Sequence, residues 1–183
     1  AGSDFTKTCS SNSSGAAIGE SAAGGYTYSW SPSSGLSSSS AANPTANPSS
    51  TTTYTVTKTH TASGCTDTDA VEVTVNTTAP TAGITNNTGS TVLTCATTSI
   101  SVTATGGSSY SWDNSLGSNA GATISGANTY TVTATAANGC TDTESITVTS
   151  NTTAPTAAAG SDFTKTCSSN SSGAAIGESA AGG

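Results

Sequence analysis

The chain has 183 residues, of which only 7% are charged, and ten acidic residues against three basic ones give a formal net charge of −7. All three cations are lysines, so the dense cationic contacts to phosphate that nucleic-acid binding requires are missing. No apolar run approaches the roughly 20 residues of a membrane-spanning helix. These features exclude a nucleic-acid-binding protein and a membrane span in this segment.

Serine and threonine dominate the composition, and large aliphatic residues are scarce. Such scarcity is typical of disordered chains, so a disordered stalk is one interpretation. Disorder usually comes with high net charge and few β-branched residues, whereas this chain is weakly charged and rich in threonine. Its few apolar residues also alternate with polar ones, which favours a folded β-structure.

The chain contains one identical long repeat. Residues Ala159–Gly183 reproduce Ala1–Gly25 letter for letter, at an offset of 158. A repeat of this kind indicates one full period of a tandem array, followed by the start of the next period.

A weaker repeat lies inside this period. The segment that starts at Cys65 returns in altered form from Cys140, and Tyr28-Ser29-Trp30 returns as Tyr110-Ser111-Trp112. We therefore expect two related domains, at residues 1–78 and 79–155, with 156–183 as the start of the next copy of the first domain. The joints, residues 76–81 and 151–156, each contain a proline that favours an extended, semi-stiff connection.

Alternation of apolar and polar residues predicts strands and no helix longer than a turn. Asn138-Gly139 between two such runs predicts a hairpin, and Ala62-Ser63-Gly64 occupies the matching position in the first domain. Short strands in domains of about 80 residues predict an all-β fold of tandem immunoglobulin-like β-sandwich domains, arranged end to end. The alternating positions are, in chain order, Tyr54 and Val56, Val71, Val73 and Val75, Ile100 and Val102, Tyr130 and Val132, and Ile146 and Val148.

Each domain has one tryptophan, Trp30 or Trp112, where a central strand is expected. We expect both to pack in the cores, and the alternative is a surface tryptophan that stacks on a sugar.

Each period has an early and a late cysteine in each domain, and Cys167 is the next copy of Cys9. We expect disulfides within the domains, Cys9–Cys65 and Cys95–Cys140, because small domains with little apolar surface need such support. Disulfides predict an oxidising, extracytoplasmic compartment. There is no Cys-x-x-Cys motif and His60 is the only histidine, so the spacing of a zinc site is missing.

Several short runs recur along the chain as recognisable motifs, at 28–32, 35–37, 43–44, 51–57, 64–68 and 139–143 and in the Thr-Ala-Pro-Thr joints. On these residues, the chain resembles the immunoglobulin-like or PKD-like surface repeats of gliding adhesins and cell-surface filaments of Bacteroidetes-type bacteria. The resemblance implies export, a β-sandwich and a scaffold or adhesive role, and it carries no catalytic residues. The chain departs from the PKD pattern, because it lacks a Trp-Asp-Phe-Gly-Asp-Gly run and has only Trp112-Asp113-Asn114.

Covalent glycans are the modification that this surface predicts, because an almost uncharged surface offers many hydroxyl acceptors. The O-linked candidates are Ser37, Ser38, Ser39, Ser40, Thr51, Thr52, Thr53, Thr77, Thr78, Thr152 and Thr153, and the Asn-x-Ser/Thr sequons are at Asn12, Asn76, Asn86, Asn151 and Asn170.

Calcium binding is possible but not favoured, and no other cofactor is expected. Asp67 and Asp69 share one strand face, and Asp142 and Glu144 repeat the pattern, but calcium needs several further oxygen ligands, for example from Asp4. The alternative interpretation is a solvated strand face that discourages edge pairing. Catalysis is not expected, since the acids are scattered and any triad would depend on His60.

These observations predict a structural repeat unit of an extracellular filament or adhesin stalk, on the cell surface or secreted, whose partners are neighbouring copies of itself. One alternative is an adhesive module that binds carbohydrate or a partner surface near Trp30 or Trp112. A second is a pilus-like subunit that lends a strand, the repeated 25 residues, to its neighbour.

Overall fold

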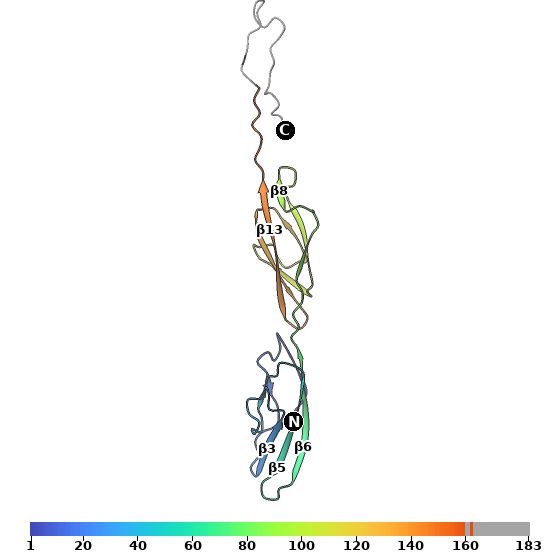
Figure 1. Ribbon diagram of the computed structural model, residues 1–183, viewed down its shortest axis with the longest axis vertical. Coiled ribbons are helices and arrows are strands. Elements are labelled where there is room, and N and C mark those ends of the chain that lie inside the picture. The colour runs from blue at the N-terminus through green and yellow to red at the C-terminus, as the bar shows by residue number, and fades with distance from the viewer. Residues whose placement is uncertain (160–161, 163–183) are drawn as a thin grey trace, which may run out of the picture. The chain divides into compact units, whose positions relative to one another are not determined.

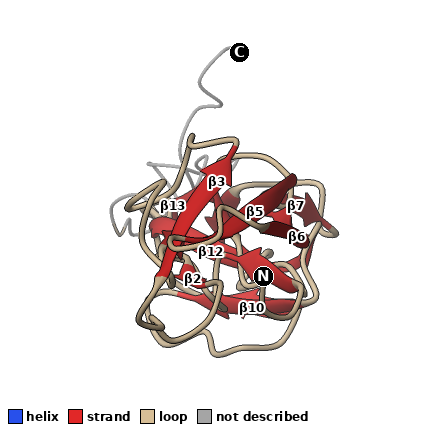
Figure 2. Cartoon of the chain, turned by 90° about the horizontal axis from the view of Figure 1, so that it is seen from below, coloured by secondary structure: helices blue, strands red, loops and turns tan. Residues whose placement is uncertain are grey.

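The computed structural model describes residues 1–159 and 162, and these residues form thirteen β-strands and no helix. The cartoon of Figure 2 accordingly shows strands joined by loops in the described part. The expected third segment, 156–183, lies outside the described residues except for 156–159 and Asp162. No helix in the described part is long and apolar enough to cross a membrane.

The first 76 residues build one sandwich of two sheets (Figure 1). The central hairpin of β5 and β6 is flanked on one side by the tryptophan-bearing strand β3 and on the other by the short strand β1. The four-stranded sheet contains β1 (Phe5–Thr8), β6 (Thr66–Asn76), β5 (Thr52–His60) and β3 (Tyr26–Ser31), and the second sheet pairs β2 (Ala16–Ala17) with β4 (Thr45–Ala46).

Residues 83–151 build a second sandwich, whose four-stranded sheet has the same strand arrangement as that of the first and whose other sheet has three strands instead of two. Its last two strands form the central hairpin, a tryptophan strand lies on one side, and a short early strand lies on the other. The sheets are β10 (Ser109–Trp112), β12 (Asn128–Thr135), β13 (Thr141–Asn151) and β8 (Val92–Thr94), and β11 (Gly121–Ile124), β9 (Ile100–Thr105) and β7 (Gly83–Asn86).

The fold is therefore all-β and of the immunoglobulin-like sandwich type, as predicted. Each sandwich has its own hydrophobic cluster, and the predicted alternation decides which side chains enter it. In β12, Tyr130 and Val132 are buried while the threonines that alternate with them are not. Tyr54 and Val56 in β5 behave in the same way, so the period-two pattern identified the strands correctly.

Both tryptophans lie in the cores, as expected. Trp30 is 3% exposed and Trp112 is 5% exposed. Their indole N–H groups donate to backbone carbonyls, from Trp30 to Ala41 at 2.9 Å and from Trp112 to Asn119 at 3.1 Å. A buried and hydrogen-bonded indole is a structural element of the core, and the surface sugar-stacking alternative is wrong for these two rings.

Two tyrosines anchor loops in the same manner. Tyr54 donates its hydroxyl to the Ser34 carbonyl at 2.7 Å, and Tyr130 donates to the Gly126 carbonyl at 3.0 Å. Burial raises the pKa of the Tyr54 hydroxyl above its ordinary value. Each hydroxyl thus fixes a loop to the central hairpin of its own sandwich.

The parallel pairing of β1 with β6 was not predicted. Phe5 lies opposite Val73, and Thr8 lies opposite Asn76, the last residue of β6. Residues 1–25 therefore contribute β1 and β2 to their own sandwich.

Candidate functional site

A disulfide between Cys9 and Cys140 joins the first sandwich to the second, with 5.0 Å between the two Cα atoms. Cys9 directly follows β1, and Cys140 directly precedes β13 in the turn of the central hairpin. The bond therefore connects the end of an early strand in one sandwich to the hairpin turn of the next.

The expected pairing of Cys9 with Cys65 is wrong, and the register of β1 shows why. Cys9 lies beside the last residue of β6, whereas Cys65 precedes its first residue. Since β6 has 11 residues, the two cysteines are separated by roughly 35 Å at about 3.3 Å per residue. A disulfide tolerates at most about 7 Å between Cα atoms.

The expected pairing of Cys95 with Cys140 is wrong for the same reason. Thr149, near the end of β13, donates its N–H to the carbonyl of Thr91 at the start of the β8 segment, at 2.9 Å. Cys95 follows β8, while Cys140 precedes the first residue of β13. The two cysteines thus lie toward opposite ends of that long strand, and Cys95 is exposed.

Asn138 organises the joint around the disulfide. Its side-chain amide donates to the carbonyl of Asn76 at 3.2 Å, to the side-chain oxygen of Asn76 at 3.0 Å and to the carbonyl of Thr78 at 2.9 Å. Its own side-chain oxygen accepts the N–H of Cys140 at 3.0 Å. One side chain therefore binds the connecting segment and orients the cysteine at the same time.

The backbone of the turn is closely fitted to the first sandwich. Cys9 donates its N–H to the Asn138 carbonyl at 3.2 Å, and the Ser10 hydroxyl donates to the same oxygen at 3.3 Å. Gly139 has φ +79°, and a Cβ on it would lie 2.4 Å from the Ser10 Cβ. Glycine is thus required at this position both by conformation and by the close approach of Ser10.

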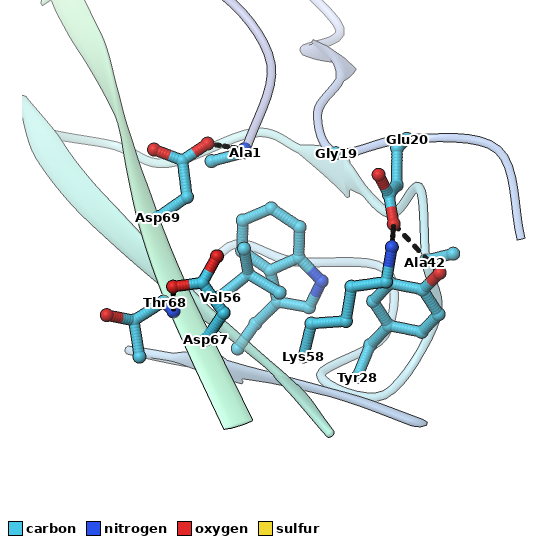
Figure 3. A pocket seen from close by; sticks show the side chains of 11 residues that line it. Ala1, Gly19, Glu20, Tyr28, Ala42, Val56, Lys58, Asp67, Thr68 and Asp69 are labelled. Atoms are coloured by element: carbon cyan, nitrogen blue, oxygen red, sulfur yellow. Dashed lines mark hydrogen bonds and ion pairs between the residues drawn. The ribbon is translucent and has the colours of Figure 1, made fainter. Parts of the chain in front are cut away.

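A second feature is a cavity of about 200 Å³ in the first sandwich, shown in Figure 3. Lys58 binds Glu20 there, and the Tyr28 hydroxyl donates to the same carboxylate at 2.9 Å. The hydrogen bond from Lys58 is the main reason that the Glu20 pKa is lowered and the Lys58 pKa is raised. The Lys58 ammonium also lies 4.5 Å from the ring centre of Tyr26. Glu20, Lys58 and Tyr28 thus satisfy one another in the wall of this cavity.

The calcium candidates do not form one site. Asp67 and Asp69 both line this cavity, so they share a face as the alternation predicts. Asp69 accepts the backbone N–H of Ala70 at 2.8 Å. Asp142 instead accepts the N–H of Ala82 at 2.8 Å.

Two further acids belong to separate places. Asp4 accepts the N–H of Glu72 at 2.8 Å, and Glu144 lies on β13 of the second sandwich. Within the described part of the chain, no group of three or more His, Cys, Asp or Glu residues could hold a metal ion.

The glycosylation candidates differ in exposure and in the hydrogen bonds that their side chains make. The amide nitrogen of Asn86 donates to the Ser90 carbonyl, and its side-chain oxygen accepts two backbone N–H groups, so this sequon is the most engaged. The amide nitrogen of Asn12 donates to the Thr6 carbonyl. The exposed candidates are Asn12, Asn76, Asn151, Ser37, Ser39, Ser40, Thr51, Thr53, Thr77, Thr78, Thr152 and Thr153, while Asn86, Ser38 and Thr52 are half-buried and Asn170 lies outside the described residues.

No protein-family model matches the chain, and no curated protein matches it. Among solved structures, the amphioxus IgVJ-C2 molecule is 14% identical over 79% of this chain and 99% of its own, with a TM-score of 0.35. A C-terminal fragment of intimin, solved in complex with the intimin-binding domain of its translocated receptor, is 18% identical over 73% of this chain and 56% of its own, with a TM-score of 0.40. Domains 4 and 5 of the S-layer protein SbsC are 19% identical over 75% and 74%, with a TM-score of 0.28. The function of this chain is therefore inferred from its own residues.

Proposed function

We propose that this chain is the repeat unit of an extracellular filament or adhesin stalk, in which immunoglobulin-like sandwiches follow one another in a tandem array. The observation that carries the proposal is the disulfide between Cys9 and Cys140, because it links successive sandwiches rather than the two sheets of one sandwich. Such a bond secures a joint, and a secured joint matters most to a protein that spans distance under load.

The disulfide also supports an extracellular location. Disulfides persist in oxidising compartments and are rare where thiol reductants are abundant. The identical repeat of residues 1–25 at 159–183 supports the tandem array, since it begins a new copy of the first domain.

The mechanical role follows from the covalent connections. A load that enters at Cys9 can pass through the disulfide to Cys140, so the chain segment between them need not carry it. The remaining segment, from Cys140 to the next copy of Cys9 at Cys167, is only 27 residues long. A stalk of this construction resists lengthening even where its sandwiches are only moderately stable.

The two alternatives receive less support. An adhesive module that reads sugars through Trp30 or Trp112 would need accessible rings, and both are buried. Strand donation would need residues 1–25 to complete a neighbour, whereas here they supply β1 and β2 to their own sandwich. Glycans on the exposed hydroxyls remain part of the proposal, and intact-mass analysis that returned the bare polypeptide mass would remove them.

Imaging of the native filament, combined with a reducing and denaturing gel, tests this proposal. We expect a row of sandwich-sized beads in the image and one very large band on the gel, because the periods belong to one chain. A ladder with steps of one period would show separate subunits instead, and isolated single beads would contradict the stalk.

A further inference from the structure

The turn that holds Cys65 in the first sandwich resembles the turn that holds Cys140 in the second, although it is one residue longer. His60 donates its N–H to the Cys65 carbonyl at 2.9 Å, and Ala136 donates to the Cys140 carbonyl at the same distance. The glycine that precedes each cysteine has a similar left-handed backbone, with φ +72° at Gly64 and +79° at Gly139.

The side chain two residues before each cysteine also has the same role. The Cys65 N–H donates to the Ser63 hydroxyl at 3.4 Å, as the Cys140 N–H donates to the side-chain oxygen of Asn138. Cys65 is exposed, whereas Cys140 is covered by the joint in which it takes part. Cys65 thus lies at the end of a similar hairpin turn, and its side chain is exposed.

Cys95 in the second sandwich has the surroundings of Cys9 in the first. The Thr8 N–H donates to the Ser11 carbonyl at 2.8 Å, and the Thr8 hydroxyl oxygen accepts the N–H groups of Ser10 and Ser11. The same turn recurs one sandwich later, where Thr94 bonds to Thr97 at 2.9 Å and its hydroxyl oxygen accepts the N–H groups of Ala96 and Thr97. Each cysteine is the second residue of an equivalent hydrogen-bonded turn.

The connecting segments agree as well. Residues 76–81 and 151–156 have the same sequence, Asn-Thr-Thr-Ala-Pro-Thr. The backbone carbonyls of Asn76 and Thr78, which bind the joint, therefore have direct counterparts in Asn151 and Thr153. The second connecting segment thus has the same two residues at the positions whose carbonyls bind Asn138 in the first.

We propose that Cys95 forms a disulfide with the Cys65 of the following period, so that every joint of the array is closed by a disulfide between adjacent sandwiches. This inference rests on the proposed tandem array, because its partner is a second copy of the first sandwich. In each bond two thiols lose two protons and two electrons, and a disulfide-bearing oxidant of the secretory route takes them up and becomes two thiols.

The loops closed by the two disulfides of a period would overlap along the chain. Cys95 lies inside the loop that the Cys9–Cys140 bond closes, and its own bond would reach into the next period. Every joint of the stalk would then have a disulfide in addition to its connecting peptide.

Disulfide mapping of the native filament tests the inference without any variant. Cleavage at acidic residues under non-reducing conditions separates all four cysteines, since Glu20, Asp67, Asp113 and Asp142 follow them in turn. We expect two linked peptide pairs, Cys9 with Cys140 and Cys95 with Cys65, in equal amounts. Alkylated thiols at Cys65 and Cys95, or a Cys65–Cys65 pair, would overturn the proposal.

A reducing and denaturing gel of the same filament tests the tandem array independently of the disulfide. If the reduced filament stays one large band while Cys65 and Cys95 are found as thiols, the tandem array is supported and the second disulfide is refuted. If the filament separates into single periods only on reduction, a disulfide between periods is supported and the continuous chain is refuted. Two linked pairs together with a reduction-resistant large band support both.

Discussion

Cys9 and Cys140 are separated by 131 residues in sequence, and they close the joint between two sandwiches with 5.0 Å between their Cα atoms. A pairing within one sandwich would have stabilised a single small core. The observed pairing instead restricts the movement of one sandwich against the next, which is a property of the connection and not of either core.

Removal of this disulfide should expose the joint to proteases before it unfolds either sandwich. We expect the double substitution Cys9→Ser with Cys140→Ser to raise the rate of cleavage within residues 76–81 about tenfold, because easing the opening of the joint by about 1.4 kcal/mol raises the open population tenfold. Cleavage by a nonspecific protease, followed by mass spectrometry, measures this rate. Cys65→Ser in the same chain is the matched control, and equal cleavage in both variants would refute the assigned role.

Asn138 should make the disulfide harder to reduce. Asn138→Ala removes three side-chain hydrogen bonds to the connecting segment and one to Cys140. Each hydrogen bond contributes about 0.5–1.5 kcal/mol net. We therefore expect that half of the Cys9–Cys140 disulfide of this variant is reduced at a thiol concentration at least severalfold lower than in the wild type.

A control for this change is Asn87→Ala. The Asn87 side chain bonds to Ser101 and Thr103, which both belong to strand β9 of the second sandwich and not to the joint. The account predicts no change in the half-reduction point for this variant. An Asn138→Ala protein that is reduced at the wild-type thiol concentration would show that Asn138 does not support the bond.

The fluorescence of Trp30 and Trp112 should indicate buried rings that do not bind sugar. Since both rings are at most 5% exposed, we expect emission typical of an apolar environment and weak quenching by iodide until the protein unfolds. Addition of surface glycans should leave the emission unchanged. A saturable response to a glycan would favour the adhesive alternative over a purely structural role.

Acid should weaken the first sandwich through Glu20. The Glu20 pKa in the folded protein lies below its ordinary value of 4.5 because of the hydrogen bond from Lys58. As the pH falls below that value, the unfolded chain takes up a proton before the folded one, so this part of the stability is present above pH 4.5 and is lost toward lower pH.

Urea unfolding at neutral and acidic pH measures this dependence. Lys58→Met should reduce the difference between the two midpoints, because it removes the main cause of the shift. Glu144→Gln, on the other sandwich, is the control and should leave the dependence of the first sandwich unchanged. The effect is expected to be small, since Glu20 and Lys58 lie near solvent. A Lys58→Met protein with the full acid dependence would contradict this explanation.

The sequence predicted the strands and the core well, because burial on one face leaves a direct trace in residue alternation. Val71, Val73, Ile100 and Val132 were all assigned to the core from this pattern, and all are buried. The hairpin at Asn138-Gly139 was predicted from turn chemistry alone and is present between β12 and β13.

The cysteine pairing could not be obtained in this way. An early and a late cysteine in each domain fit pairing within a sandwich and pairing between sandwiches equally well. The choice depends on the parallel register that places Thr8 beside Asn76, and such pairing has no local sequence signature. The network of Glu20, Tyr28 and Lys58 was missed for a similar reason, because it joins a loop to two strands that are distant in sequence.

Force–extension measurement on a multi-period chain tests the central claim most directly. With its disulfides intact, one period can lengthen only through the segment from Cys140 to Cys167, a distance of 27 residue steps, which spans about 90–100 Å when fully extended. After addition of a thiol reductant, the whole 158-residue period should extend to about 520–570 Å. The account predicts this several-fold difference, and an oxidised chain that extends by several hundred ångströms per period would contradict it.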